Sequence, residues 1–332
     1  MAKVLALPDI SVDDGFFALG GHSLLASQLA SQLSKQVGIQ MPMRAVFEAP
    51  TARRLASWIE EAKSEGAKAA WSIPRRADQS RAPLSAMQQR MWFLEQLDPG
   101  KTFHNTPSAH RLHGQLDEGA FARAFAEMVR HQDILRTVII AEDESPIQRI
   151  LASVEYELFP AHDLRLLPPA QREPALLAAL DELIAQPFQL DEPPLFRAKM
   201  FRLDENEYVL FFMVHHIIWD GWSFDLLYEE IHALYDAFRQ QLPSPLPALT
   251  VNYGDFAVWQ RHWMGSDQAR AEVDHWRNVL DGALAPLAVP TDFPRPAVMS
   301  GNGRMVWMNV PGKLISAIHE LGNRVGATTY MT

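Results

Sequence analysis

The stretch YVLFFMVHHIIWDG, which runs from Tyr208 to Gly221, indicates how the larger part of this chain folds. Its first half, Tyr208–Val214, is almost entirely apolar, as in a strand that is buried on both faces of a sheet. Asp220-Gly221 is typical of a turn, and Trp222–Arg239 has the periodicity of a helix. A buried strand followed by a turn and a long helix predicts a mixed α/β domain around this segment.

The flanking sequence extends this pattern in both directions. The stretch 66–83 is rich in Ala, Arg, Ser and Pro and lacks periodicity, so it is predicted to be an interdomain linker. A second proline-rich stretch, Pro286–Pro296, is predicted to be a hinge between two lobes. We expect helices at 85–97, 118–131, 253–263 and 313–325, and strands at 135–140, 195–203 and 304–310.

The adjacent histidines His215 and His216 are the first candidates for chemistry in this domain. Neighbouring residues of a strand point to opposite faces, so these two side chains do not readily converge on one metal ion. No third His or Cys follows at a zinc-like spacing, and the chain contains no cysteine. We therefore expect no metal site, with one histidine facing a cleft and the other packed behind it.

The N-terminal part of the chain has a different pattern. Ser23–Val37 places leucines on one helical face, Gly38 is typical of a helix end, and Ala52–Ile59 predicts another helix. The loop before the first of these helices reads DGFFALGGH from Asp14 to His22. Residues 1–62 are therefore predicted to form a small helical unit.

Ser23 stands where this loop meets the helix, and two roles are open to it. Its hydroxyl can cap the free backbone N–H groups of the helix. Alternatively, the paired glycines Gly20 and Gly21 let the backbone turn tightly and leave the serine accessible. A phosphate on its oxygen would then meet the positive end of the helix dipole.

Composition restricts the classes of function. The 332 residues include 30 Lys and Arg against 40 Asp and Glu, a formal charge of −10, which argues against sequence-independent binding to nucleic acid or anionic lipid. No apolar stretch is long enough to span a bilayer, and the N-terminus lacks the features of a signal peptide. We expect a cytoplasmic protein that binds neither nucleic acid nor a membrane.

Residues Asp14–Leu25 resemble the attachment motif of the peptidyl carrier proteins of nonribosomal peptide synthetases, in which an acidic residue and paired aromatics precede Leu-Gly-Gly-His-Ser. The resemblance implies a small four-helix carrier bundle. It also implies that Ser23 carries 4′-phosphopantetheine, which a phosphopantetheinyl transferase attaches. The thiol at the end of this group would hold an aminoacyl or peptidyl group as a thioester.

Residues His215–Gly221 resemble the His-His-x-x-x-Asp-Gly motif of condensation domains, whose two lobes are similar to chloramphenicol acetyltransferase. The family motif places its functional histidine second. The resemblance thus implies that His216 accepts a proton from the attacking amine or positions it, and that His215 is structural. It further implies an ion-pairing role for Asp220 and a close backbone approach at Gly221. Three other stretches are similar to family motifs in the family's order: 85–94, 130–137 and 253–259.

The two resemblances together imply a domain order and a reaction. A carrier (1–65) and a linker (66–83) would precede a first condensation lobe (84–285) and a hinge with the start of a second lobe (286–332), whose remainder would lie beyond Thr332. An upstream adenylation domain would load the carrier. The condensation domain would then transfer the donor acyl group to the amine of an aminoacyl thioester on a downstream carrier domain.

There are three alternatives to a condensation domain: two related enzyme domains and one module without catalytic activity. An epimerisation domain shares the fold and the paired histidines and also follows a carrier. A heterocyclisation domain has aspartates in place of the histidines, so it is disfavoured. A non-catalytic docking module, with a condensation-like lobe that only binds partners, is the third alternative, and the intact His216 and Gly221 argue against it.

Overall fold

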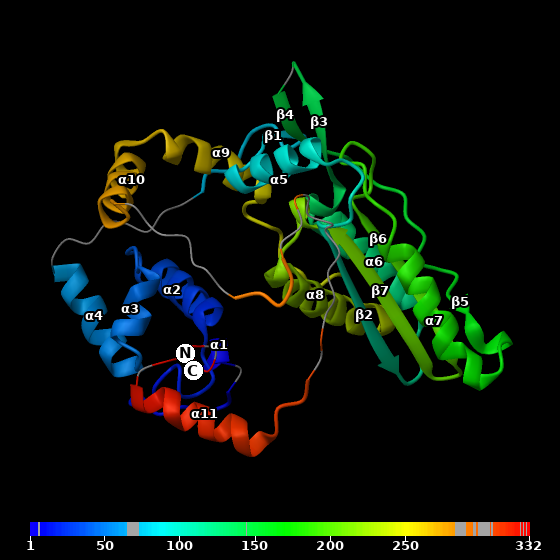
Figure 1. Ribbon diagram of the computed structural model, residues 1–332, viewed down its shortest axis with the longest axis horizontal. Helices are drawn as coiled ribbons and strands as arrows, with labels where there is room; N and C mark the ends of the chain where they lie inside the picture. The colour runs from blue at the N-terminus through cyan, green and yellow to red at the C-terminus, as the bar shows by residue number, and fades with distance from the viewer. Residues whose placement is uncertain are drawn as a thin grey trace. The chain divides into compact units, whose positions relative to one another are not determined.

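The computed structural model divides the chain into two compact units, one of residues 1–72 with 300–332 and one of residues 73–299 (Figure 1). It describes residues 1–5, 7–64, 73–143, 145–282, 290–294, 297, 306, 308–325, 327, 329 and 331–332. In these parts of the chain, no helix combines the length and the apolar character needed to cross a bilayer.

The first unit contains the small helical bundle that the sequence predicts. Its helices up to Ser64 are α1 (Ala2–Leu5), α2 (Ser23–Val37), α3 (Met43–Glu48) and α4 (Ala52–Ser64). Their apolar faces meet in one core, which includes Phe16, Ala26, Leu29, Val46 and Leu55. Gly38 ends α2 with φ 75°, a left-handed conformation that favours glycine, and its N–H donates to Ser34 O. Helix α11 (Gly312–Val325) belongs to the same unit.

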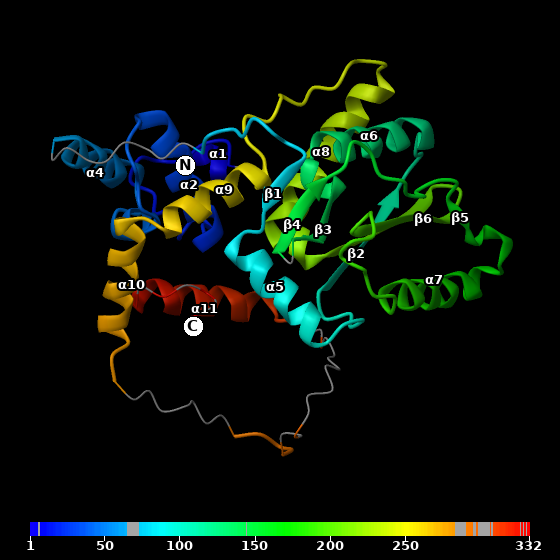
Figure 2. The same ribbon diagram turned by 90° about the horizontal axis from the view of Figure 1, so that it is seen from above.

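The second unit is built on a four-stranded sheet in the order β2 (Asn105–His113), β7 (Glu207–His215), β6 (Phe196–Asp204), β5 (His162–Asp163). Strand β7 pairs antiparallel with both β2 and β6 and is buried at every residue except Glu207. This confirms the prediction of a strand covered on both faces. Figure 2 shows α7 (Pro169–Ile184) on one side of the sheet, and α6 (Glu118–His131) and α8 (Gly221–Arg239) on the other.

A smaller sheet completes the second unit. It has the order β1 (Arg81–Pro83), β4 (Ser145–Ile150), β3 (Thr137–Glu142). Helix α5 (Ala86–Leu97) follows β1, and α9 (Tyr253–Met264) and α10 (Asp267–Val279) follow α8. Strand β3 begins later than predicted because Asp133–Arg136 is a 3-10 turn, in which the Arg136 guanidinium pairs with Asp133 and donates to Val129 O.

Residues 73–83, the second half of the predicted linker, include regular structure that the sequence did not predict. Arg81–Pro83 pairs with β4 as strand β1. Arg76 is nearly buried, and its Nε lies 3.3 Å from Oδ1 of Asp255 in α9. Gly254 lacks a side chain where one would collide with this guanidinium, since a Cβ there would lie 1.9 Å from Arg76 Nη1. This segment therefore packs on the second unit, whereas residues 65–72 lie outside the described residues.

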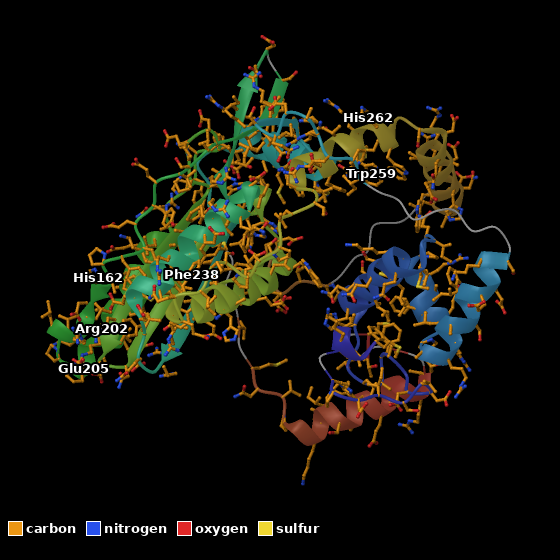
Figure 3. All side chains as sticks on the ribbon, turned by 180° about the vertical axis from the view of Figure 1, so that it is seen from behind. His162, Arg202, Glu205, Phe238, Trp259 and His262 are labelled. Carbon is orange, nitrogen blue, oxygen red and sulfur yellow. The ribbon has the colours of Figure 1, made fainter. Side chains whose placement is uncertain are left out.

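One further difference from prediction concerns a segment of the first unit, and a charged network lies at one end of the second. The predicted strand 304–310 lies mainly outside the described residues, and residues 306 and 308–310 form no strand. Figure 3 labels His162, Arg202 and Glu205 at the β5 end of the large sheet, far from Trp259 and His262 of α9. At that end Arg165 pairs with both Asp163 and Glu205, and its hydrogen bonds lower the pKa of Asp163 to about 2. We assign this network a structural role.

Candidate functional site

The two histidines at the end of β7 have opposite environments, because the strand ends at the buried His215 and His216 begins a 3-10 turn, so strand alternation is not the cause. The side chain of His215 is 3% exposed, whereas His216 is exposed and lines a pocket. Two backbone hydrogen bonds fix the strand end here, from His215 N to Leu195 O at 2.9 Å and from His216 N to His104 O at 2.8 Å. The structure therefore places His216, and not His215, at the accessible position.

One hydrogen bond defines the tautomer of neutral His216. Its Nδ1 lies 2.5 Å from the carbonyl oxygen of Trp219. A carbonyl can only accept, so Nδ1 must carry the proton and donate it. Nε2 of the neutral ring then keeps a free lone pair, which is the form that a proton acceptor needs.

His215 is held behind the pocket by two contacts. Its Nδ1 accepts from the backbone N–H of Ile217 at 3.0 Å, so its Nε2 carries the proton and faces Oε1 of Glu95 at 3.4 Å. Burial lowers the pKa of His215, with the Glu95 carboxylate opposing this shift, so the neutral ring is favoured. These contacts support the structural role expected for His215.

Asp220 and Gly221 form the beginning of α8. The Asp220 carboxylate accepts from Ser223 N at 3.0 Å and from Ser223 Oγ at 2.8 Å, and thus caps the helix. No ion pair is recorded for Asp220 among the described residues, and its expected ion-pairing role stays a prediction. A Cβ on Gly221 would have no atom within 4 Å. The glycine therefore borders open space, and the close backbone approach expected there stays a prediction.

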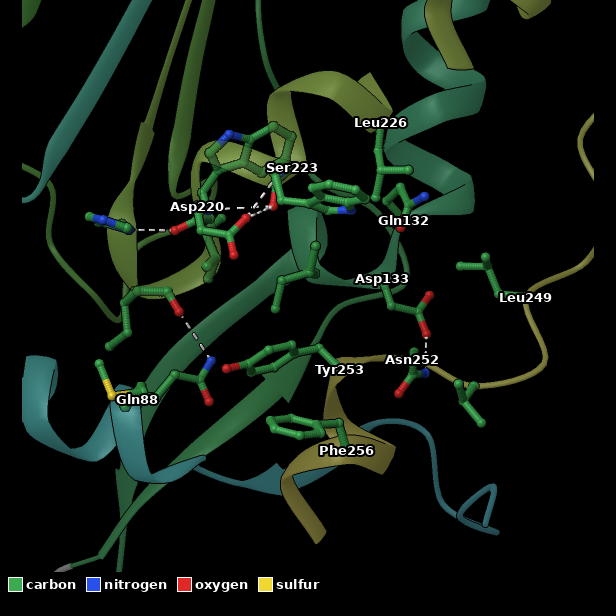
Figure 4. Close-up of a pocket in the computed structure, with 18 of the residues that line it drawn as sticks. Gln88, Gln132, Asp133, Asp220, Ser223, Leu226, Leu249, Asn252, Tyr253 and Phe256 are labelled. Carbon is green, nitrogen blue, oxygen red and sulfur yellow. Dashed lines mark hydrogen bonds between the residues drawn. The ribbon is translucent and has the colours of Figure 1, made fainter. Parts of the chain in front are cut away.

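His216 and Asp220 line a pocket of about 630 Å³ between α5, α8, α9 and the turn that follows β7 (Figure 4). Tyr253 and Phe256 of α9 extend their rings into the view from one side, and Asp220 and Ser223 lie on the other (Figure 4). The volume falls in the range of small-molecule sites. Among the described residues that line the pocket, acidic groups such as Asp220 and Glu230 occur, and neither Lys nor Arg does.

Tyr253 is a pocket residue whose role the sequence did not reveal. Its hydroxyl lies 2.9 Å from Ser85 Oγ, at the start of α5. Burial raises the pKa of Tyr253, which keeps the phenol neutral and able to donate a hydrogen bond. The stretch 253–259 resembles a family motif, but only the fold brings it beside α5 and α8.

Polar contacts beneath the pocket fix its walls. Gln88 Nε2 donates to Ile217 O at 3.2 Å and to Gln148 Oε1 at 3.3 Å, which ties α5 to the turn after β7 and to the small sheet. Asn252 Nδ2 donates to Asp133 Oδ2 at 2.7 Å, which ties the start of α9 to the 3-10 turn after α6 (Figure 4). The site is thus assembled from segments that are distant in sequence.

In the first unit, Ser23 is the first helical residue of α2, after His22 at the capping position. The side chain of His22 makes no capping hydrogen bond, so it leaves the N–H groups of the first turn to another acceptor. Gly20 has φ 96°, and a Cβ on Gly21 would lie 2.5 Å from the ring and the carbonyl of Phe16. This glycine turn and helix start fit a phosphate group on Ser23.

Two apolar residues of α3, Met43 and Phe47, face outward. Met43 is 45% exposed, and Phe47 stacks on Phe17 with ring centroids 4.6 Å apart. Arg44 of the same helix is also exposed. Met41 and Val46 are buried in the core.

Comparison with known proteins assigns a family to most of the chain. The family model described as condensation domain matches residues 78–332, and the model described as phosphopantetheine attachment site matches residues 1–59. The chain is 38% identical over its whole length to a linear gramicidin synthase from Brevibacillus parabrevis, and 35% identical over 99% of its length to malpibaldin synthetase of Mortierella alpina. The chain spans only 6% of each of these relatives.

Solved structures confirm the predicted fold class. The X-domain from teicoplanin biosynthesis has a TM-score of 0.65 and 26% identity, over 77% of this chain and 56% of that one. The starter condensation domain of rhizomide synthetase has a TM-score of 0.56 over 61% of this chain and 49% of that one, and at 21% identity it supports the fold alone. The chain belongs to the condensation-domain family of nonribosomal peptide synthetases, and its N-terminal part is a phosphopantetheine-binding carrier domain.

Proposed function

We propose that this chain is a donor carrier followed by the condensation domain that uses it to form a peptide bond. The observation that carries the proposal is the exposed His216, whose Nδ1 is bound to Trp219 O and whose Nε2 is left free beside the pocket. The acidic, cation-free lining of the described pocket suits an amine substrate, because carboxylates attract its protonated form.

In this reaction the amine must be in its neutral form, and its nitrogen lone pair attacks the carbonyl carbon of the donor thioester. The C–N bond forms, the C–S bond breaks, and the sulfur leaves with the electron pair of that bond. His216 Nε2 accepts the proton that the nitrogen loses and returns it to the leaving thiolate. A second possibility for the same residue is that it positions the amine without taking the proton. Since a thioester is already activated, holding the reactants together supplies a large part of the rate in either case.

The remaining site residues have supporting roles in the proposal. Asp220 caps α8 and so fixes the turn beside His216. Gly221 keeps open the space into which a side chain would project. His215 holds the strand end in place through Ile217.

Ser23 is the proposed attachment site of 4′-phosphopantetheine. When attached, this group supplies the thiol that carries the acyl chain. The chain's own contribution is the glycine turn and the first-turn N–H groups of α2, which can bind the phosphate. A phosphopantetheinyl transferase would modify the serine, and exposed Met43 and Phe47 would form part of the surface that meets partner domains.

The proposed domain limits are a carrier at 1–65, a linker, and condensation lobes from residue 84 with a hinge after residue 285. The contacts of Arg76 and β1 support moving the start of the condensation domain to about residue 73. An upstream adenylation domain, a downstream aminoacyl carrier and a cytoplasmic location complete the proposal.

The test is loading followed by transfer in the complete protein. With a phosphopantetheinyl transferase and coenzyme A, the wild type should gain one phosphopantetheine mass and Ser23→Ala none. Acyl groups loaded on Ser23 should then leave for a separately supplied aminoacyl carrier. Equal mass gain by Ser23→Ala would refute the attachment site, and transfer only in the opposite direction would refute the donor role.

A non-catalytic docking module is the second candidate. The X-domain that this chain resembles is described in a complex with a second protein, OxyB, which is the observation that favours it. A docking module would bind a loaded carrier without transferring its acyl group. Binding with no transfer in the experiment above would therefore select this candidate.

A further inference from the structure

A compact polar cluster lies directly behind His216. Glu95 of α5 is 9% exposed, and its Oε1 lies 2.6 Å from Nδ1 of His104 and 3.4 Å from Nε2 of His215. The two imidazole rings are 5.6 Å apart. One buried carboxylate thus joins the end of α5, the segment before β2 and the end of β7.

The composition of this cluster is that of a zinc site, and its ligand atoms lie within 4.8 Å of one another. The hydrogen bond at Nδ1 of His215, on the side of the ring away from Glu95, argues against metal binding. Its Nδ1 accepts from Ile217 N–H, so Nε2 of the neutral ring holds the proton. A protonated nitrogen cannot bind a metal, and moving the proton to Nδ1 would set it against the N–H of Ile217. The cluster fits a carboxylate that accepts two N–H donors.

We propose that Glu95 is a positioning residue for His216, an inference that rests on the proposed function of that histidine. Glu95 holds His104, whose carbonyl oxygen accepts from the backbone N–H of His216 at 2.8 Å. Glu95 also holds His215, whose Nδ1 accepts from the backbone N–H of Ile217 at 3.0 Å. Glu95 therefore fixes both peptide N–H groups that flank the His216 Cα.

This placement sets the ring of His216. Its hydrogen bond to Trp219 O spans the turn that begins at His216, so the ring keeps its orientation only while that turn is held. The pKa of Glu95 is lowered. Burial alone would raise this pKa, but the hydrogen bonds from His215 and His104 outweigh the effect of burial, so the carboxylate stays ionised and accepts both hydrogen bonds.

The test compares Glu95→Met with Glu95→Gln, with Gln96→Met as the control on the exposed face of the same helix. Methionine keeps the length of the side chain and removes both acceptors, whereas the Gln oxygen can still receive both N–H groups. Long-range ¹H–¹⁵N spectra of the histidine rings report the tautomer of His216 without any activity. We expect one Nδ1–H form in the wild type, the glutamine variant and the control, and a mixture in Glu95→Met.

Kinetics in the complete protein provide the second measurement. Glu95→Met should lower kcat for transfer on the order of 10²-fold with KM little changed, because a small misplacement of a reacting group is costly. Glu95→Gln should recover at least about a third of the wild-type rate, since it restores the contacts. A merely structural role would lower thermal stability and the yield of active protein, without changing the His216 tautomer.

Three results would overturn the inference. The first is an unchanged His216 spectrum in a folded Glu95→Met variant, and the second is a glutamine variant as impaired as the methionine one. The third is stoichiometric Co²⁺ binding to the wild type, with a visible absorption band that Glu95→Met lacks, which would make the cluster a metal site. If His216→Ala does not slow transfer but the spectra change as expected, the proposed function fails while the positioning by Glu95 stands.

Discussion

Replacing Arg76 by methionine tests whether the segment before β1 is anchored on the condensation unit. The Arg76 side chain is 9% exposed and that of Asp255 is fully buried, and their nearest atoms are 3.3 Å apart. The variant removes the cation and leaves the carboxylate in place. Asp255 still accepts from the backbone N–H groups of residue 76 and Asn252, both at 2.9 Å, and from Gln79.

The size of the effect follows from these contacts. Removing one partner of a buried ion pair costs about 3–5 kcal/mol. The three remaining hydrogen bonds stabilise the carboxylate, so we expect the lower limit, about 3 kcal/mol. For a unit of this size the melting temperature should then fall by about 6–12 °C. Arg76→Met combined with Asp255→Asn should cost less than the sum of the two single changes, because no unpaired charge is left.

Calorimetry and chemical unfolding of the chain measure this loss, and the matched control is Arg75→Met. Arg75 is exposed, and its guanidinium donates to Leu249 O at 2.6 Å. Its replacement should cost no more than about 1 kcal/mol. A loss below about 0.5 kcal/mol for Arg76→Met would show that residues 73–80 are a free linker, as their composition suggested.

Three further predictions follow from single residues. Gly221→Ala should leave the melting temperature equal or higher, since Ala favours a first helical turn by up to ~1 kcal/mol. The same change should slow acyl transfer, because the new methyl group fills the open space beside Gly221. A transfer rate equal to that of the wild type would show that the reaction does not need this space. Gly21→Ala should destabilise the carrier unit by about 1–3 kcal/mol in chemical unfolding through its collision with Phe16, and a neutral change would contradict the packing. Burial lowers the pKa of His215 and His110 below the ordinary 6.5, so the unfolded chain binds more protons than the folded one. The free energy of unfolding should therefore decline as the pH falls below about 6.5. His215→Asn should flatten this decline, and an unchanged slope would contradict the lowered pKa of His215.

The sequence predicts elements well where composition and burial agree. Strand β7 and helix α8 have strong apolar patterns, and both form within two residues of their expected limits. Strand β2 was missed because its sequence, NTPSAHRLH, is mostly polar, which is possible at the edge of a sheet with one side unpaired. Helix α7 was missed as well, and Pro174 within it weakens the helical signal.

The residues of the candidate site and its surroundings also fall into two groups, those that the sequence reveals and those that it does not. His216 and Asp220 belong to one local motif, so the sequence alone pointed to them. Glu95, Arg76 and Tyr253 act through partners that lie more than a hundred residues away in the chain, as in the bond between Glu95 and His215. Local patterns contain no signal for such pairs, which only the folded sheet and helices bring together.

The most direct test of the central claim is the rate of acyl transfer from loaded Ser23 to a downstream aminoacyl carrier, measured in a single turnover for wild type and His216→Ala in the complete protein. A proton acceptor at this position predicts a loss on the order of 10²–10⁴-fold with the fold intact. A much smaller but definite loss would indicate the positioning role. A rate equal to that of the wild type, or loss of transfer in a stable His215→Ala variant alone, would contradict the assignment of His216 as the reactive residue.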